Sequence, residues 1–263
     1  MKLVDTPDLG SGAVRYKSSS LLWGTYLCNM IVFYKNYDYD SYQIRSDRTY
    51  LSIQSVRYLF PNIDIRCLFL YNESPNEYDD KISKFKDLGV TIYFSKKTHR
   101  IGDGSGRGSE YNGLYFTEGI NKIQNICKDI DDKVLILDED SYFTTGETIR
   151  FLQNNKFDFA YAEWPSPYPV IYKEKAKVGI NGSILCINPK KLNSFFPIIE
   201  QAEYVETLLG HEIYEKCLEL NYKVIEIETK IYPNFKDGIW TNESSVIEKE
   251  LKENNIPFKK LNE

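Results

Sequence analysis

The chain has 263 residues, of which 42% are hydrophobic and 27% are charged, a balance typical of globular proteins and unlike that of disordered, collagenous or coiled-coil chains. Its 33 basic and 38 acidic residues give a formal charge of −5, so no overall basic field is available to hold nucleic acid. We therefore expect a folded chain of one or two domains that does not bind nucleic acid.

The N-terminal segment, residues 1–20, has no apolar stretch of signal-peptide length and is expected to be an arm. The most apolar segment, residues 21–34, is too short and too polar to cross a bilayer. Five scattered cysteines with no C-x-x-C pair indicate reduced thiols in a cytoplasm-like compartment. These features predict no integral membrane segment; peripheral membrane association, or origin from a longer anchored protein, stays compatible with them.

From residue 28 the hydrophobic pattern alternates between short β-type runs and helical spacing. Strands are expected at 28–35, 63–72 and 90–95, helices at 49–59 and 76–88, and Gly89 as the C-cap of the second helix. A glycine-rich loop (101–113) and a helix (114–128) lead to residues 133–137, an uninterrupted apolar run typical of a strand covered on both faces. This order predicts an α/β fold with a mostly parallel central sheet flanked by helices.

Three acids, Asp138, Glu139 and Asp140, follow that apolar run. Because side chains alternate along a strand, Asp138 and Asp140 are expected on one face and Glu139 on the other. Two carboxylates on one face repel each other unless a cation lies between them, and hard oxygen ligands favour Mg²⁺ or Mn²⁺. Strand carboxyl ends also form the ligand-binding edge of open α/β sheets. The alternative is a solvated turn in which Asp140 caps a helix at 145–152.

An apolar strand ending in D-x-D, midway along a chain that begins β-α-β-α-β, resembles the nucleotide-sugar-dependent glycosyltransferases of the GT-A fold. The resemblance implies that Asp138 and Asp140 bind Mn²⁺ or Mg²⁺ against the donor diphosphate, with Asp138 also near the ribose. It further implies a Rossmann-like architecture with these limits: a GT-A domain at 21–242, comprising a nucleotide-binding half (21–150) and an acceptor half (151–242), followed by a C-terminal helix and tail (243–263).

Residues 178–192 resemble the strand that lines the sugar pocket of glycogenin-like glycosyltransferases, with Asn181-Gly182-Ser183 in place of Asn-Ser-Gly. Asn181 offers a donor and an acceptor to a sugar hydroxyl, and Gly182 allows the backbone to approach a ligand closely. Both are therefore expected to bind the donor. A plain turn that opens a strand is the alternative.

Four more residues are candidates for contact with the donor. Arg107 and Asn112 lie in the glycine-rich loop, where the GT-A fold places a basic residue and a helix start near the phosphates. No G-K-[ST] closes this loop, which argues against an ATPase, and an unliganded surface loop is the alternative. Glycogenin-like enzymes close a C-terminal segment over the diphosphate; here Lys236 and Trp240 would meet and shield the leaving phosphate, although the histidine of that segment is absent.

The acceptor side offers candidates for catalysis and binding. Glu212 is expected as a general base for the acceptor hydroxyl, with His211 and Asp237 as alternatives, against the simpler interpretation of a solvent-facing glutamate beside a packed histidine. A base is required only if configuration inverts, because the leaving phosphate can take the proton in a retaining reaction. Glu163 and Trp164 are expected to form an acceptor-binding wall, since tryptophan stacks on sugar rings; core packing is the alternative.

The residues and the resemblance together imply a metal-dependent glycosyltransferase that moves a sugar from a nucleoside-diphosphate sugar to a hydroxyl of a glycan or protein. Three alternatives stay open. A non-catalytic carbohydrate- or partner-binding module would use the acids structurally. A sugar-nucleotide pyrophosphorylase would need a basic, glycine-rich loop after the first strand, and a haloacid-dehalogenase-like phosphatase would need Thr or Val where Tyr142 stands.

Overall fold

The computed structural model describes residues 30–37, 42–71, 79–96, 109–139, 141–163, 170–172, 175–177, 180–198, 206–227, 235–236, 239–240 and 244–261. Its longer strands are β1 (Met30–Tyr37), β2 (Asp64–Tyr71), β3 (Val90–Lys96), β4 (Lys133–Asp138), β5 (Phe159–Glu163), β8 (Ile180–Ile187) and β9 (Val224–Ile227). The helices are α2 (Tyr42–Leu59), α3 (Asp79–Asp87), α4 (Ser109–Cys127), α5 (Glu147–Asn154), α6 (Pro189–Leu192), η2 (Asn193–Phe195), α7 (Glu206–Glu219) and α8 (Ser244–Glu253).

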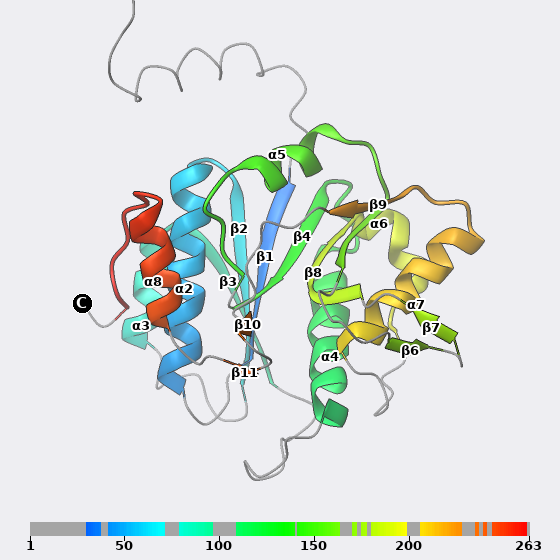
Figure 1. Ribbon diagram of the computed structural model, residues 1–263, viewed down its shortest axis with the longest axis horizontal. Helices are drawn as coiled ribbons and strands as arrows, with labels where there is room; N and C mark the ends of the chain where they lie inside the picture. Colours follow the sequence, from blue (N-terminus) through cyan, green and yellow to red (C-terminus); the bar gives the residue numbers. More distant parts are fainter. Residues whose placement is uncertain are drawn as a thin grey trace, which may run out of the picture.

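The seven longer strands form one sheet in the order β3-β2-β1-β4-β8-β5-β9, with helices on both faces (Figure 1). Neighbouring strands are parallel except where β8 pairs antiparallel with β4 and β5. Two short ribbons lie outside it, β6 (Val170–Tyr172) with β7 (Lys175–Lys177) and β10 (Phe235–Lys236) with β11 (Ile239–Trp240). The expected α/β class with a mostly parallel sheet is confirmed.

The strand order changes direction between β1 and β4. The chain passes from β1 through α2 to β2 and through α3 to β3, and α4 then carries it back to β4 on the other side of β1. Residues of α2 and α3 pack in the core on one face of the sheet, whereas residues of α4 pack on the opposite face. Such a reversal leaves a crevice at the carboxyl ends of the two strands that flank it.

Side-chain alternation along the strands divides the core into two layers. On β1, Val32 and Tyr34 belong to the layer under α2, α3 and α5, whereas Ile31 and Phe33 belong to the layer under α4, α6 and α7. All residues of β4 are buried, as the uninterrupted apolar run predicted. The carboxyl end of β4 is therefore held by packing on both faces.

The helices end close to the expected positions, but two of them begin earlier than expected. α2 starts at Tyr42 rather than at residue 49, so its first two turns consist mostly of polar residues that precede the expected helix. α4 starts at Ser109 rather than at residue 114, so Asn112, expected in the glycine-rich loop, lies in this helix. Gly89 ends the α3 turn with φ +69° and its amide donates to Lys86 O at 2.8 Å, which confirms the expected C-cap. Within the described residues, no helix combines the length and apolar character needed to cross a bilayer.

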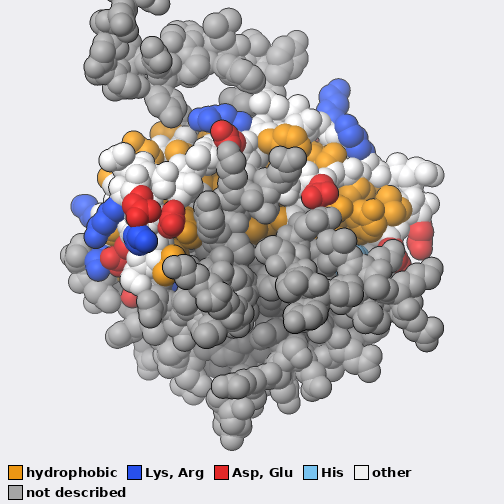
Figure 2. All heavy atoms as spheres, viewed as in Figure 1, with side chains coloured by type: hydrophobic (Ala, Val, Ile, Leu, Met, Phe, Trp, Pro, Cys, Tyr) orange, Lys and Arg blue, Asp and Glu red, His pale blue; other side chains and the backbone are white. Residues whose placement is uncertain are grey.

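The C-terminal segment packs on α2. Gln54 Nε2 donates to Lys259 O at 2.9 Å and Lys259 N donates to Gln54 Oε1 at 2.8 Å, so the two residues are linked twice. A third small core joins Leu51 of α2 and Tyr142 to residues of the C-terminal segment, Ile247, Leu251 and Ile256. On the outer face of α8, acidic and basic side chains lie next to each other (Figure 2), and Lys260 Nζ is 2.9 Å from Glu248 Oε2.

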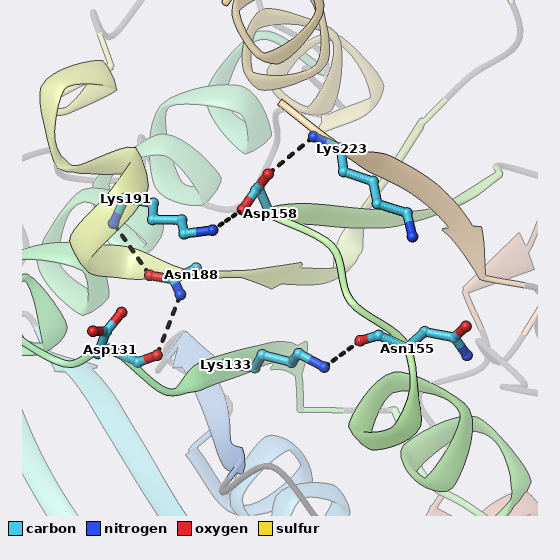
Figure 3. Close-up of polar contacts among 7 residues, drawn as sticks. All are labelled: Asp131, Lys133, Asn155, Asp158, Asn188, Lys191 and Lys223. Atoms are coloured by element: carbon cyan, nitrogen blue, oxygen red, sulfur yellow. Dashed lines mark hydrogen bonds and ion pairs between the residues drawn. The ribbon is translucent and has the colours of Figure 1, made fainter. Parts of the chain in front are cut away.

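Charged and amide side chains tie the strands together at the edge opposite the carboxyl end of β4 (Figure 3). Asp158 accepts hydrogen bonds from Lys191 Nζ at 2.5 Å and from Lys223 N at 2.9 Å. Asn188 caps α6 by accepting from Lys191 N at 3.1 Å, and its own amide donates to Asp131 O at 3.2 Å. These contacts are explained by the junction of β4, β5, β8 and β9, and they need no ligand.

Candidate functional site

The carboxyl ends of β1 and β4 lie side by side at the reversal in strand order, and the start of β8 meets them there. Lys35 of β1 is the register partner of Asp138 of β4. The β4–β8 ladder ends at the pair Leu137 and Ile184, next to Asp138 on one strand and to residue 183 on the other. The sequence segments expected to bind the metal and the sugar are therefore neighbours in space.

Asp138 is a buried carboxylate with a buried partner. Lys35 Nζ lies 2.8 Å from Asp138 Oδ1, and the two side chains are 0% and 6% exposed. Lysine is almost never fully buried without a partner, because its ammonium loses its hydration. The pair places one positive and one negative charge at the strand ends, on the same face as Phe33 and α4.

Glu139 points to the opposite face of the sheet, toward α2. Its Oε1 lies 3.5 Å from Arg48 Nη2, and the Arg48 side chain is 2% exposed. Consecutive acids thus have different partners on different faces, as alternation along the strand requires. Glu139 is only 4% exposed, so the residue at the variable position of the D-x-D pattern is buried rather than solvated.

Hydrogen bonds hold the backbone that follows. Ser52 Oγ donates to Glu139 O at 3.3 Å, and Ser141 N donates to Asp138 O at 3.1 Å. Tyr34 Oη donates to Ser141 O at 3.2 Å. Burial raises the pKa of Tyr34 well above its usual value, so its hydroxyl keeps the proton that this bond needs.

The register of β8 shifts at the segment expected to bind the sugar. Leu185 pairs with Tyr161 of β5, but the next pair is Asn181 with Ala162, so β8 gains residues that β5 does not match. The irregularity includes Gly182. Bulges re-aim the backbone near functional sites, and a glycine tolerates the unusual geometry. The described backbone thus bends at the residues that the sequence singled out.

α7 approaches the same edge through Gly210. A Cβ built on Gly210 would lie 2.1 Å from Ile180 Cγ2, so this glycine allows the helix to touch the first residue of β8. The next residue, His211, is 5% exposed and its ring meets Tyr214 edge-on with centroids 6.5 Å apart. His211 is therefore a packed histidine, whereas Glu212 on the following position is partly exposed.

The other sequence candidates are only partly visible. Arg107, Asp140, Trp164 and Asp237 lie outside the described residues. The structure gives only backbone positions for Asn112 in α4, Glu163 at the end of β5, and Lys236 and Trp240 in the β10–β11 ribbon. Glu163 pairs with Ile180 in the β5–β8 ladder, so its backbone lies at the same edge as Asn181.

Sequence reasoning missed Lys35, Arg48 and Ser52. Lys35 was assigned to the end of a strand, but its register with β4 depends on the tertiary fold. Arg48 and Ser52, together with Ser55, follow the spacing i, i+4, i+7 and so share one face of a helix. A polar stripe on one face of a helix could have indicated these partners. The stripe was not visible because the expected helix, 49–59, begins after Arg48.

The chemistry of the donor set fits a hard divalent cation in part. Among the described residues, no group of three or more His, Cys, Asp or Glu side chains is arranged to hold a metal ion. A carboxylate has two oxygens, and the ion pair with Lys35 involves Oδ1 of Asp138. Asp138 is thus compatible with a site that Asp140 and the ligand itself would complete.

No protein-family model matches this sequence, and no curated protein matches it in sequence. Solved structures are similar to it in part, at low identity. The mannosyltransferase PcManGT from Pyrobaculum calidifontis, solved with GDP-Man and Mn²⁺, is 9% identical with a TM-score of 0.48; the match covers 94% of this chain and 72% of that one. The galactosyltransferase LgtC, solved with donor and acceptor sugar analogues, is 15% identical with a TM-score of 0.45, over 75% and 73% of the two chains.

A second kind of transferase is also similar. The 4-diphosphocytidyl-2C-methyl-D-erythritol synthase from Anaerococcus prevotii is 11% identical with a TM-score of 0.46, and the match covers 86% of this chain and 98% of that one. The solved structures that are partly similar to this chain thus include both glycosyltransferases and a nucleotidyltransferase, all at TM-scores below 0.5.

Proposed function

We propose that this protein is a metal-dependent glycosyltransferase that takes a sugar from a nucleoside-diphosphate donor and passes it to a hydroxyl group. The observation that carries the proposal is the position of Asp138. It is a buried carboxylate at the carboxyl end of an interior strand, beside the reversal in strand order, where open α/β sheets bind nucleotides. The β8 irregularity at Asn181 and Gly182 lies next to it.

In this proposal Asp138 and Asp140 hold Mn²⁺ or Mg²⁺ with the donor diphosphate. The bound cation would balance the negative charge that develops on the diphosphate as the bond to the anomeric carbon breaks. Arg107, Asn112, Lys236 and Trp240 are the proposed phosphate-side contacts of this chain.

The sugar would lie against Asn181 and Gly182, and the acceptor near Glu163 and Trp164. Glu212 is proposed to accept the proton of the acceptor hydroxyl, with Asp237 as the alternative base. His211 is buried against Tyr214, which favours a packing role for it. The acceptor is a glycan or a protein, and either a retaining or an inverting course is compatible with these residues.

The sequence between β1 and α2 favours glycosyl transfer over nucleotidyl transfer. Residues 36–42 contain three tyrosines and two aspartates but no glycine, lysine or arginine. A pyrophosphorylase would need a basic, glycine-rich loop there to hold the triphosphate. The phosphatase alternative is disfavoured by Tyr142, which is 1% exposed and packs in the core with Leu51 and α8.

The proposal extends to organisation and location. One GT-A domain would span residues 21–242, with the nucleotide-binding and acceptor halves meeting near residue 150. The four cysteines that the structure describes, Cys67, Cys127, Cys186 and Cys217, are buried free thiols. Free thiols support the proposed reducing, cytoplasm-like compartment.

The test is a thermal-shift panel of nucleoside diphosphates with and without Mn²⁺. One nucleotide is expected to raise the Tm only when Mn²⁺ is present, and Asp140→Asn should abolish that increase. Asp131→Asn is the matched control because Asp131 is an exposed aspartate at the opposite edge of the sheet, paired with Lys190 at 3.1 Å. An increase that persists unchanged in Asp140→Asn would contradict the metal assignment, and hydrolysis of simple phosphate esters would favour a phosphatase.

A further inference from the structure

α2 presents an unusual surface to the segment that carries the acids. We call residues 138–143 the acidic loop, and Arg48, Ser52 and Ser55 the polar stripe. The three residues of the polar stripe share one face of α2 and are at most 2% exposed. A helix normally covers its neighbours with apolar side chains, so a buried polar face needs partners.

The acidic loop supplies those partners along two turns of the helix. Arg48 meets the Glu139 carboxylate at 3.5 Å, and Ser52 Oγ donates to Glu139 O at 3.3 Å. One turn further, Ser55 Oγ accepts from Phe143 N at 3.1 Å. The chain between β4 and α5 therefore runs along α2, as Figure 1 shows.

The same helix also holds the end of β1. Asn36 Nδ2 donates to Thr49 Oγ1 at 2.8 Å, one residue beyond Lys35. α2 thus bonds to the carboxyl ends of both strands at the reversal in strand order. These bonds are directional, and they fix the rotation of the backbone as well as its position.

Glu139 cannot reach a ligand on the face of Asp138, since its side chain points to α2 and is 4% exposed. An ion pair this deeply buried contributes little to stability relative to apolar residues of the same shape, although breaking it on one side is costly. Its chief effect is therefore on geometry. With Glu139 held by Arg48 on one face, the side chain of the preceding residue, Asp138, is kept on the other.

We propose that Arg48 and Glu139 form a positioning pair that orders the described residues of the acidic loop, and so aims Asp138 at the cation and the diphosphate. The role in ligand binding rests on the proposed function, whereas the ordering of the loop does not. Residues that hold metal ligands in place typically change metal affinity or activity about 10- to 100-fold when they are replaced.

The test compares loop order and ligand affinity in an apolar double variant, Arg48→Met with Glu139→Met. Amide hydrogen exchange, measured by NMR in the ligand-free protein, should be faster than in the wild type at Ser141 and Phe143, whose amides donate to Asp138 O and Ser55 Oγ. The Tm should change little, because both charges are removed together. Nucleoside-diphosphate affinity in the presence of Mn²⁺ should fall about 10- to 100-fold.

Two further variants separate positioning from stability. Glu139→Gln keeps the shape of the side chain and an oxygen that can accept from Arg48, and it serves if the double variant does not fold; exchange at Ser141 and Phe143 should again be faster and affinity lower, together with a lower Tm because Arg48 loses its charged partner. Lys191→Met removes a partner of Asp158 at the opposite edge of the sheet and should lower the Tm without changing nucleotide affinity.

Unchanged exchange at Ser141 and Phe143 would overturn the inference. So would faster exchange with an unaltered affinity, because the order of the loop would then not serve the ligand. If the wild-type protein binds no nucleoside diphosphate with Mn²⁺, the proposed function fails, and the exchange rates alone decide whether the pair orders the loop.

Discussion

Individual charged residues define the chemistry of this protein more than any single motif does. Lys35 and Asp138 form a buried ion pair at the ends of adjacent strands, and Arg48 and Glu139 form another across the sheet edge. Each pair neutralises one acid of the D-E-D triplet. In the proposed metal site, Asp140 would add its charge to the oxygen lone pairs of Asp138 that Lys35 does not use.

Replacing Lys35 by methionine should destabilise the protein strongly, because the Asp138 carboxylate would stay buried without its ammonium partner. We expect Lys35→Met to lower the free energy of unfolding by about 3–5 kcal/mol. The double variant Lys35→Met with Asp138→Leu should recover much of this loss, since it removes both charges. Urea unfolding of the four proteins of this cycle measures the effect, and a double variant no more stable than Lys35→Met would refute it.

Glu212 is the partly exposed acid beside the buried His211. If Glu212 accepts the acceptor's proton, Glu212→Gln should lower kcat by about 10²- to 10⁴-fold and leave donor affinity nearly intact. Steady-state kinetics with the nucleotide sugar found by thermal shift would measure both constants. Glu215→Gln, one turn further along α7, is the control. Unaltered turnover in Glu212→Gln would remove Glu212 from the catalytic candidates.

At the residue scale the sequence predicted the acids but not their partners. Alternation along a strand was sufficient to separate Asp138 from Glu139. The partners Lys35 and Arg48 lie 103 and 91 positions away in the chain, and no local pattern encodes such a contact. Buried cations in particular could not be expected, because lysine and arginine are almost always exposed.

At the scale of secondary-structure elements, one close contact between α7 and β8 fixes the position of α7 at the candidate site. Gly210 touches Ile180 so closely that any side chain would collide with it. This contact sets the height of α7 over the bulged strand. Because His211 and Glu212 follow directly, it also sets how near these residues lie to Asn181.

Gly210→Ala should destabilise the protein although alanine favours helix. Overpacking costs about 1–3 kcal/mol, which outweighs the gain of about 1 kcal/mol in helix propensity. In an Ile180→Gly background both atoms that the added methyl group would meet, Cγ2 at 2.1 Å and Cβ at 2.7 Å, are gone, so the same substitution should become neutral or stabilising. Urea unfolding in both backgrounds measures this, and an equal loss in both would show that Ile180 is not the obstacle.

The elements themselves were largely predictable from periodicity. The expected strand at 90–95 is β3 (Val90–Lys96), and the apolar run at 133–137 is β4. The start of α2 was missed because its first two turns are mostly polar and follow a tyrosine-rich segment, and polar residues in a buried helix look like a loop. The bulge in β8 could not be predicted beyond the presence of Gly182, because it depends on pairing with β4 and β5 together.

The described part of the molecule is a sheet between two helical layers, and the four described cysteines lie in the cores on both sides of the sheet. Cys67 and Cys186 belong to the layer under α2, whereas Cys127 and Cys217 belong to the layer under α4 and α7. Burial raises the pKa of Cys127 to about 11 and that of Cys217 to about 12, from a usual value of 9.0. These thiols hold their protons at neutral pH and are poor nucleophiles.

Stability should fall as the pH rises above about 9. The unfolded chain then releases thiol protons that the folded chain still holds, so protons favour the folded state and their loss favours unfolding. The contribution is complete below pH 9 and disappears as the pH rises through the folded pKa values of about 11 and about 12. Urea midpoints between pH 7 and 11 should decline less in Cys127→Ala/Cys217→Ala, and an identical decline would contradict the assignment.

The global arrangement followed from the order of elements, except for the antiparallel strand. Alternating strands and helices require a mostly parallel sheet with covered faces, and that is observed. The insertion of β8 between β4 and β5 has no local signal, because the apolar run at residues 184–187 of β8 resembles the runs of strands that pair in parallel. The same insertion brings residues 181–183 next to Asp138. Which residues meet at the candidate site therefore depends on the position of β8, which sequence patterns do not predict.

The double link between Gln54 and Lys259 has a practical consequence for anyone who produces this protein. The C-terminal tail is hydrogen-bonded to one side of α2, and another side of α2 is hydrogen-bonded to residues 139 and 143. A recombinant protein truncated at residue 243, or one with an affinity tag placed between α8 and α2, would lose these two hydrogen bonds. Under the proposed function, the loss would appear as a lower affinity for the nucleotide at the carboxyl end of β4.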